Sequence, residues 1–399
     1  MRPLWALLGP AFVAAIAYVD PGNIAANVSA GSQFGFLLVW VIVLANVMAA
    51  LVQYLSAKLG LVTGRTLPEA VRDRTRRPTR IAYWIQAELV AIATDVAEII
   101  GGAIALRLLF DLPLVLGGLI TGVVSLLLLM LGDRRGQRIF ERVITGLLLI
   151  ITIGFLASLV VNPPPAAAVA SGLVPRFDGV QSVLLATAML GATVMPHAVY
   201  LHSGLARDRH GHPEPGERRA ELLRATRWDV GIAMLVAGTV NLALLLVAAT
   251  NLRGRENTDT IEGAHAAVAA TLGPTVALFF AVGLLASGLA STAVGAYAGA
   301  MIMQGLLRRY FPLLVRRLVT LVPALALLAS GVEPTLALVL SQVVLSFGIP
   351  FALVPLVRLT ADRALMGADT NRGLTSLLGW TVTALVTLLN GALIYLTLA

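Results

Sequence analysis

The stretch "AYVDPGNIAANVSAGSQFG", residues 17–35, places Asp20, Pro21 and Gly22 inside the first long apolar run of the chain. A carboxylate at the bilayer centre costs at least about 3 kcal/mol on insertion scales. Non-helical backbone at that depth is tolerated only against protein or a water-filled cavity. We therefore expect the helix to open here, so that Asp20, Asn23 and freed carbonyls offer oxygen ligands to a cation. The alternative is a turn at the membrane surface in which Asp20 caps a helix.

The composition is that of a polytopic membrane protein. Of the 399 residues, 58% are hydrophobic and 13% are charged, and the mean hydropathy is +0.87. A water-soluble domain is about half apolar and a quarter charged. The apolar runs are continuous and do not alternate with period two, which favours transmembrane helices over a barrel. The chain has no cysteine, which excludes disulfides and thiolate ligands, so that a soft sulfur ligand must be methionine.

We predict eleven transmembrane spans from the positions of the apolar runs. The first run also has some features of a signal peptide, but it continues into the Asp20 motif, so we interpret it as a span. The predicted spans are residues 6–33, 36–59, 81–108, 113–131, 143–162, 180–205, 229–250, 273–306, 314–331, 335–357 and 374–398.

The basic residues orient these spans in a cell membrane. Of the 29 lysine and arginine residues, 25 fall on the side of the N-terminus. Cytoplasmic loops carry such an excess of positive charge. We therefore expect a cytoplasmic N-terminus and, with eleven spans, an extracellular C-terminus. The net charge of +8 comes from these loop arginines and does not indicate nucleic-acid binding.

A second interrupted span, "LLATAMLGATVMPHAVYLHSG" at residues 184–204, contains Pro196 between Met195 and His197. The interrupted spans are the first and the sixth, so two five-span units would run with inverted topology. Broken helices at matching positions of inverted repeats indicate a substrate site at the membrane midplane. The predicted organisation is a five-helix repeat (1–162), an extracellular linker (163–179), an inverted five-helix repeat (180–358), and a loop with an eleventh helix (359–399).

The second break supplies two further candidate groups. The Met195 thioether would favour softer metals over magnesium and calcium, although a methionine in a membrane helix is usually a packing residue. His197 is interpreted as a proton-path group or a residue behind the metal ligands. His202 is equally well explained as a hydrogen-bonded structural residue.

Span three carries Glu88, Asp95 and Glu98 within a sector of about 80°. Three acids on one stripe of a membrane helix suggest a proton relay or a wet vestibule. A compatible structural explanation is pairing with arginines, for which Arg316 and Arg317 are the nearest candidates in the predicted topology. Two more polar residues in spans are Gln342, which could join the site, and Asn390, which we expect to hold helices together.

Enzyme and ATPase motifs such as H-E-x-x-H and G-x-x-x-x-G-K-[ST] are absent from the sequence. We therefore expect a transporter driven by a proton or ion gradient, not an enzyme. A carrier of amino acids or organic cations and a membrane-embedded metalloenzyme remain the alternatives.

The sequence resembles the natural resistance-associated macrophage protein (Nramp) family of proton-coupled divalent metal transporters. "DPGN" at Asp20–Asn23 and "MPH" at Met195–His197 match the two motifs of that family, and the resemblance covers nearly the whole chain. It implies an all-helical, leucine-transporter-type fold with eleven helices and a 5+5 inverted repeat. It also implies Mn²⁺ and Fe²⁺ as transported substrates and H⁺ as co-substrate. We expect no resident cofactor and no obligatory protein partner.

The resemblance also assigns roles to individual residues. Metal binding is implied for Asp20, Asn23 and Met195, for the backbone carbonyls of Ala17 and Ala192 in some states, and for Gln342 when the protein faces outward. Roles in proton movement are implied for His197, Asp95, Glu98, Arg316 and Arg317. Because Met195 is present, the chain resembles the branch that transports transition metals, not the branch that transports Mg²⁺.

Overall fold

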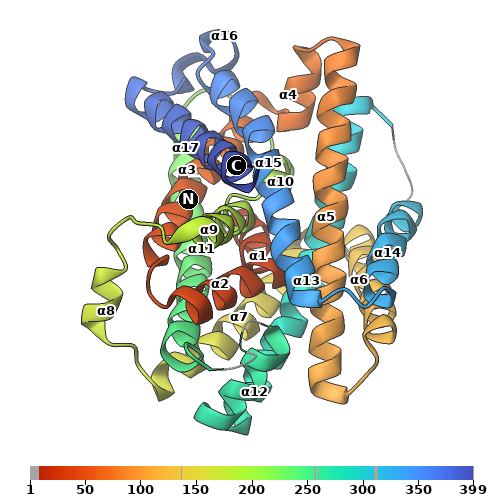
Figure 1. Ribbon diagram of the computed structural model, residues 1–399. Coiled ribbons are helices and arrows are strands. Elements are labelled where there is room, and N and C mark those ends of the chain that lie inside the picture. Colours follow the sequence, from red (N-terminus) through yellow and green to blue (C-terminus); the bar gives the residue numbers. More distant parts are fainter. Residues whose placement is uncertain (1–8, 136, 256–257, 259, 310–312, 399) are drawn as a thin grey trace.

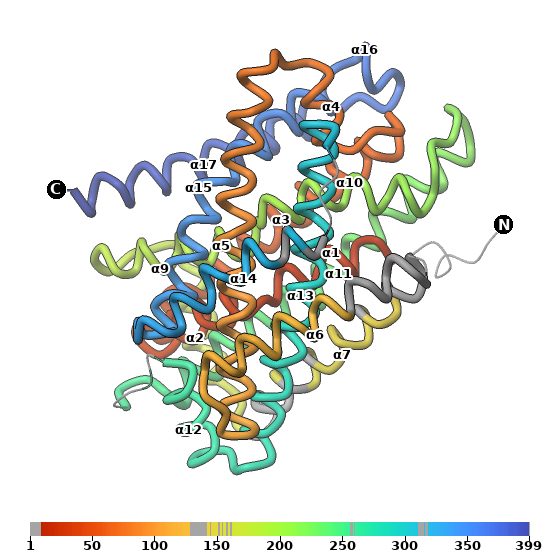
Figure 2. The backbone as a smooth tube through the Cα atoms, turned by 90° about the vertical axis from the view of Figure 1, so that its right-hand side faces the viewer, coloured from red at the N-terminus to blue at the C-terminus, as the bar shows by residue number. Residues whose placement is uncertain are grey.

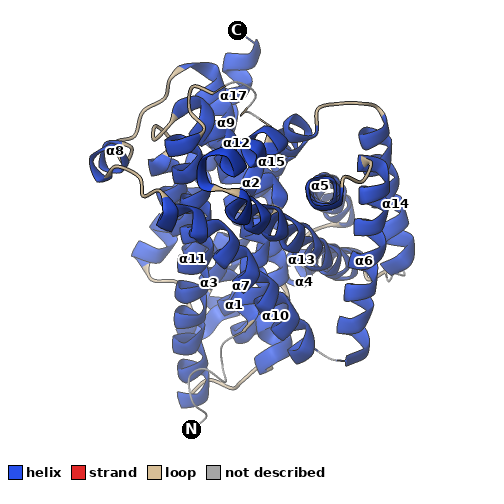
Figure 3. Ribbon diagram, turned by 90° about the horizontal axis from the view of Figure 1, so that it is seen from below, coloured by secondary structure: helices blue, strands red, loops and turns tan. Residues whose placement is uncertain are grey.

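The structure is a computed structural model that describes residues 9–135, 137–255, 258, 260–309 and 313–398. These residues form helices and their connections, with no strand among them (Figure 3). The elements in chain order are α1 (Pro10–Ile16), η2 (Ala17–Val19), α2 (Pro21–Phe34), α3 (Val39–Thr63), α4 (Leu67–Asp73), α5 (Arg77–Phe110), α6 (Leu114–Arg135), α7 (Gln137–Val161), α8 (Ala166–Ser171), α9 (Gly179–Thr193), α10 (Pro196–His210), α11 (Glu217–Asn251), α12 (Ile261–Leu272), α13 (Pro274–Leu307), α14 (Leu313–Ala329), α15 (Pro334–Thr360), α16 (Arg363–Met366), η3 (Gly367–Asp369) and α17 (Gly373–Leu398).

The first apolar run is divided at Asp20. A 3₁₀ turn, η2, tightens the end of α1, and Asp20 then adopts an extended conformation with φ −74° and ψ 165°. Pro21 occupies the first position of α2, where its missing N–H costs no hydrogen bond. Asp20 caps the new helix, because its Oδ1 accepts a hydrogen bond from the backbone amide of Asn23 at 2.7 Å. The capping role proposed as the alternative is therefore present, but Asp20 is fully buried inside the protein.

The second break lies between α9 and α10. Val194 (φ −103°, ψ 57°) and Met195 (φ −66°, ψ 119°) leave helical geometry, and Pro196 begins α10. Both Val194 and Met195 are fully buried. The proline again starts the second helix of the pair, as Pro21 does in the first break.

The elements around the breaks form the centre of the bundle. Helix α2 packs against α11, α9 and α15, and α10 packs against α3 and α13. Helix α13 lies along α5, with α6 and α14 on the outer side of α5 (Figures 1 and 2). The short helices α4 and α16, which lie in arginine-rich connections, are at the opposite end of the bundle from α12.

Each predicted span falls on a helix or a pair of helices in the structure. Among the described residues, seven helices are long and apolar enough to cross a membrane, and three shorter stretches are also apolar. The count of eleven crossings therefore stays a prediction. Helices α5 and α11 are longer than the predicted spans, because they begin at Arg77 and Glu217 whereas the spans begin at residues 81 and 229. Arginine and glutamate continue a helix well beyond its apolar part.

The short helices α4, α8 and α12 were not predicted. The predicted linker, residues 163–179, contains one of them, because Ala166–Ser171 is helical. Alanine is the best helix former, and the proline cluster ends just before this alanine-rich stretch.

Small residues allow a close helix contact, and the expectation that Asn390 holds helices together is confirmed. A Cβ atom at Gly288 of α13 would lie 3.0 Å from the Gly102 amide nitrogen of α5, so small residues do allow close packing here. Asn390 of α17 accepts a hydrogen bond from Ser346 Oγ at 2.7 Å and donates one to the Ser346 carbonyl at 2.8 Å. Asn390 therefore links α17 to α15.

Candidate functional site

Asn23 connects the two helix breaks. Its Nδ2 donates to the Tyr18 carbonyl at 2.6 Å and to the Ala192 carbonyl at 3.0 Å. Tyr18 precedes the first break and Ala192 precedes the second, so one buried amide joins segments 169 residues apart. The structure thus brings together the two motifs that the sequence singled out.

Asp20 and Gln342 meet on the other side of the first break. Gln342 Nε2 of α15 donates to Asp20 Oδ2 at 3.3 Å, and both side chains are fully buried. Gly22 permits this approach, because a Cβ atom there would lie 1.7 Å from Gln342 Nε2. Similarly, a Cβ atom at Gly191 would lie 2.0 Å from the Gln342 carbonyl oxygen. Glycines on both interrupted helices therefore let α15 reach the centre.

Carbonyls freed by the first break are held by polar side chains that sequence reasoning missed. Asn241 Nδ2 of α11 donates to the Tyr18 carbonyl at 2.8 Å, and Ser287 Oγ of α13 donates to the Val19 carbonyl at 2.5 Å. Asn27 Nδ2 donates to Asn241 Oδ1 at 3.1 Å and to Asn23 Oδ1 at 3.4 Å. The available signal was a polar residue in the middle of an apolar helix.

Met195 and Ala17, two of the predicted metal-binding residues, lie at the second and the first break respectively. Met195 is the residue before α10 and is fully buried, and Ala17 begins η2 and is 1% exposed. The described residues contain no group of three or more His, Cys, Asp or Glu side chains that could hold a metal. A cation site here would combine one carboxylate with amide, carbonyl and thioether donors.

The groups predicted for proton movement begin next to the second break. His197 Nδ1 lies 3.5 Å from Thr94 Oγ1 of α5, and Asp95 follows Thr94 directly. His197 is 2% exposed, and its Nε2 has no hydrogen-bond partner among the described residues. His197, Asp95 and Glu98 are all buried, and both acids lie on α5.

The three acids of α5 do not share one environment. Asp95 and Glu98 are buried, and a Cβ atom at Gly295 of α13 would lie 3.1 Å from Glu98 Oε1. Glu88 instead lines a cavity between α5, α13 and α14. The side chains of Arg316 and Arg317, the expected partners, lie outside the described residues.

His202 belongs to a hydrogen-bonded set, which supports the structural alternative. Its Nδ1 lies 2.6 Å from Gln53 Oε1 of α3, and Gln53 Nε2 donates to the Tyr18 hydroxyl. All three side chains are fully buried. They connect α10 through α3 to the turn before Asp20.

A multi-pass helical protein in which two interrupted helices meet at buried polar groups has the architecture of a secondary membrane transporter. The family described as natural resistance-associated macrophage protein-like matches residues 11–396. The divalent metal cation transporter MntH of Mycobacterium tuberculosis is 71% identical over 397 residues, covering 100% of this chain and 93% of that protein. The chain therefore belongs to the natural resistance-associated macrophage protein-like family, whose members are transporters, not enzymes.

Solved structures agree with this assignment. A crystal structure of the Eremococcus coleocola manganese transporter has a TM-score of 0.84 and 34% identity, covering 97% of this chain and 85% of that one. The nucleobase-cation-symport-1 family transporter Mhp1 has a TM-score of 0.63 at 17% identity, covering 97% and 92% respectively, and so shares the fold.

Proposed function

We propose that this protein is a proton-coupled importer of divalent transition metals, Mn²⁺ and Fe²⁺ among them, that works by alternating access. The observation that carries the proposal is the hydrogen bond from the side-chain amide of Asn23, at the first break, to the Ala192 carbonyl, just before the second break. The names of the relatives, a divalent metal cation transporter and a manganese transporter, support the same substrate class.

The metal ligands would be Asp20, Asn23 and Met195, with the carbonyls of Ala17 and Ala192. Carboxylate, amide and carbonyl oxygens bind hard divalent ions, and a thioether adds preference for softer transition metals. Ala192 and Asp20 are at present hydrogen-bonded by Asn23 and Gln342. An arriving cation would replace these donors, so the site would exchange protein hydrogen bonds for metal coordination.

The proton route would run from Asp20 through His197 to Asp95 and Glu98, with Glu88, Arg316 and Arg317 nearer the cytoplasm. The contact between His197 and Thr94 supports this direction, since it brings the second break to α5. Intramembrane acids and histidines are the usual components of proton relays.

The proposed architecture is the eleven-span, 5+5 inverted repeat with a cytoplasmic N-terminus and an extracellular C-terminus. The interrupted helices α1–α2 and α9–α10 would be the first and sixth spans, unwound at the midplane. The arginine-rich connections containing α4 and α16 lie at one end of the bundle, which supports that end as cytoplasmic.

Proteoliposomes that contain the purified protein test the proposed function. Wild-type protein should take up Mn²⁺, faster with an inward proton gradient, and an internal pH dye should report acidification during uptake. Asp20→Asn should abolish Mn²⁺ uptake because the carboxylate is the one anionic ligand in the proposed set, whereas Asp208→Asn, at a partly exposed ion pair, should not.

Wild-type-like uptake by Asp20→Asn would refute the site assignment. Mn²⁺ uptake without acidification would refute the proton coupling while leaving metal transport intact. Gradient-driven uptake of an amino acid or organic cation in place of Mn²⁺ would support the alternative carrier.

A further inference from the structure

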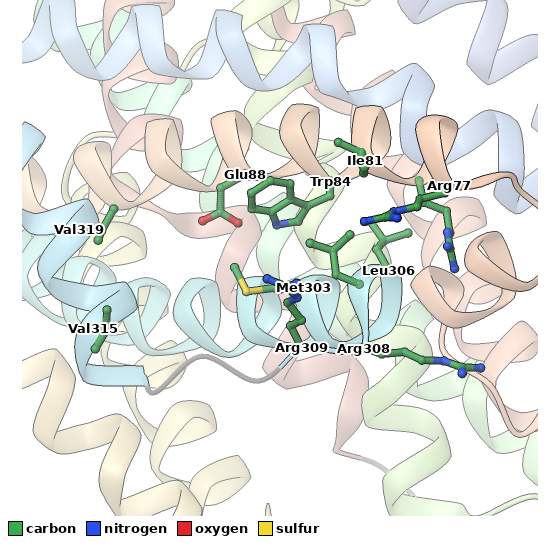
Figure 4. A pocket seen from close by; sticks show the side chains of 12 residues that line it. Arg77, Ile81, Trp84, Glu88, Met303, Leu306, Arg308, Arg309, Val315 and Val319 are labelled. Atoms are coloured by element: carbon green, nitrogen blue, oxygen red, sulfur yellow. The ribbon is translucent and has the colours of Figure 1, made fainter.

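The cavity that Glu88 lines is at the arginine-rich end of the bundle, away from the helix breaks. It has a volume of about 870 Å³ and opens between α5, α13 and α14 (Figure 4). Figure 4 shows Trp84 of α5 and Met303 of α13 pointing toward one another across it. None of the proposed metal ligands lines this cavity, and of the described side chains in the proposed proton route only Glu88 lies in its wall.

Four arginines line the cavity: Arg77, Arg80, Arg308 and Arg309. None of them forms an ion pair with a carboxylate of the part of the chain that the structure describes, whereas Arg65, Arg74 and Arg207 at the same end do. Glu88 is the one acid among the described lining residues. The cavity therefore has excess positive charge, which suits an anion.

Trp84 supplies a donor at the same place. Its indole Nε1 is buried and has no hydrogen-bond partner among the described residues. A buried donor without an acceptor destabilises the folded protein. An oxygen-rich group in the cavity would accept this hydrogen bond and remove that destabilisation.

Apolar side chains also line the cavity. Val315 and Val319 of α14 lie on the side away from Arg77 and Arg308, whereas Ile81 of α5 lies beside Arg77 (Figure 4). Ile81, Val315 and Val319 are 38%, 45% and 58% exposed, and on a helix that crosses the membrane such side chains face lipid chains. A ligand that fits the whole cavity must therefore be anionic at one end and apolar at the other.

We propose that this cavity binds the phosphate headgroup of an anionic glycerophospholipid from the cytoplasmic leaflet, with the acyl chains along α5 and α14. Basic pockets between transmembrane helices on the cytoplasmic side recognise such headgroups. The proposal goes beyond metal transport and depends on the proposed function only for the orientation of the bundle. Free phosphate would satisfy the arginines but would leave the apolar wall without a partner.

Thermal unfolding of delipidated, detergent-solubilised full-length protein tests the proposal. Phosphatidylglycerol is titrated in one arm, phosphatidylcholine in a second and inorganic phosphate in a third. The unfolding temperature should rise with phosphatidylglycerol and stay unchanged with the other two. An equal rise with inorganic phosphate would identify an anion site and overturn the lipid assignment, and an equal rise with phosphatidylcholine would overturn it as well.

Matched variants locate the effect. Arg80→Gln/Arg309→Gln should weaken the apparent phosphatidylglycerol affinity about 30-fold, since each arginine near a lipid surface contributes about one kcal/mol. The control Arg224→Gln/Arg363→Gln removes two exposed arginines from the same end outside the cavity and should bind like wild type. Trp84→Phe keeps the ring, removes the N–H and should also weaken binding.

If the cavity pair and the control pair lose phosphatidylglycerol affinity equally, the effect comes from the net charge of the protein, which would contradict a specific lipid site in the cavity. Unaltered affinity in the cavity pair and in Trp84→Phe would contradict it too. Because the readout is lipid binding in detergent, failure here leaves Mn²⁺ uptake, and with it the proposed function, untouched.

Discussion

Asp20 uses its two carboxylate oxygens for different purposes. Oδ1 accepts a hydrogen bond from the backbone amide of Asn23 and so caps the N-terminus of α2. Oδ2 accepts one from Gln342 Nε2 on α15. The cap fixes the carboxylate at the end of a helix, and the second contact is the one that the proposed cation would replace. The same residue thus caps the helix at the break and places a carboxylate oxygen inside it.

Met195 is the residue that should set metal preference. In Met195→Ala the proposed site contains only oxygen ligands, which do not discriminate against hard ions. We expect Ca²⁺ or Mg²⁺ to compete better with Mn²⁺ in the variant than in wild type. Competition uptake in proteoliposomes measures this, and unchanged inhibition by Ca²⁺ would count against a ligand role for Met195.

We expect Asn241 to affect metal affinity indirectly, through its hydrogen bonds to Asn27 and to the Tyr18 carbonyl. Asn241→Ala removes the hydrogen bond to the Tyr18 carbonyl and the acceptor of Asn27. Loss of such an outer partner typically lowers metal affinity about 10- to 100-fold. Isothermal titration with Mn²⁺ measures this change. Asn46→Ala is the matched control, because Asn46 also donates to a backbone carbonyl, that of Met234, at 3.0 Å. Equal losses in both variants would refute a specific role for Asn241.

At the scale of elements, α1 is attached to α11 through its first residues. Asp229 of α11 accepts from the Gly9 amide at 3.0 Å and from the Ala11 amide at 2.9 Å. A carboxylate at a helix N-terminus satisfies donors that have no partner within the helix. This attachment holds the half-helix that leads into the first break.

Asp229→Ala should loosen α1, since losing a cap costs about 0.5–2 kcal/mol. The absence of native cysteine makes Ala14→Cys, at a fully buried position of α1, a clean reporter. Its labelling by a maleimide should accelerate by about 2- to 30-fold in the Asp229→Ala background. Asp208→Ala, which removes a partly exposed ion pair, should leave the rate unchanged. Equal labelling in all three proteins would show that Asp229 does not restrain α1.

At the scale of the molecule, the sequence predicted the helices and the two breaks because both leave strong local signals. Long apolar runs mark the helices, and Asp20-Pro21 and Met195-Pro196 mark the breaks. The pairing of Asn23 with Ala192 could not be derived in this way, because their contact depends on packing across 169 residues. The supporting Asn241 and Ser287 were missed because a single polar residue in a helix has many possible roles.

The central claim is that the two breaks together form one metal site. Anomalous diffraction from crystals soaked with Mn²⁺ tests it most directly, in wild type and in Asp20→Asn. We predict one anomalous peak between the carboxylate of Asp20 and the thioether of Met195, absent from Asp20→Asn crystals. A peak at another place in wild type, or one that persists unchanged in Asp20→Asn, would contradict the claim.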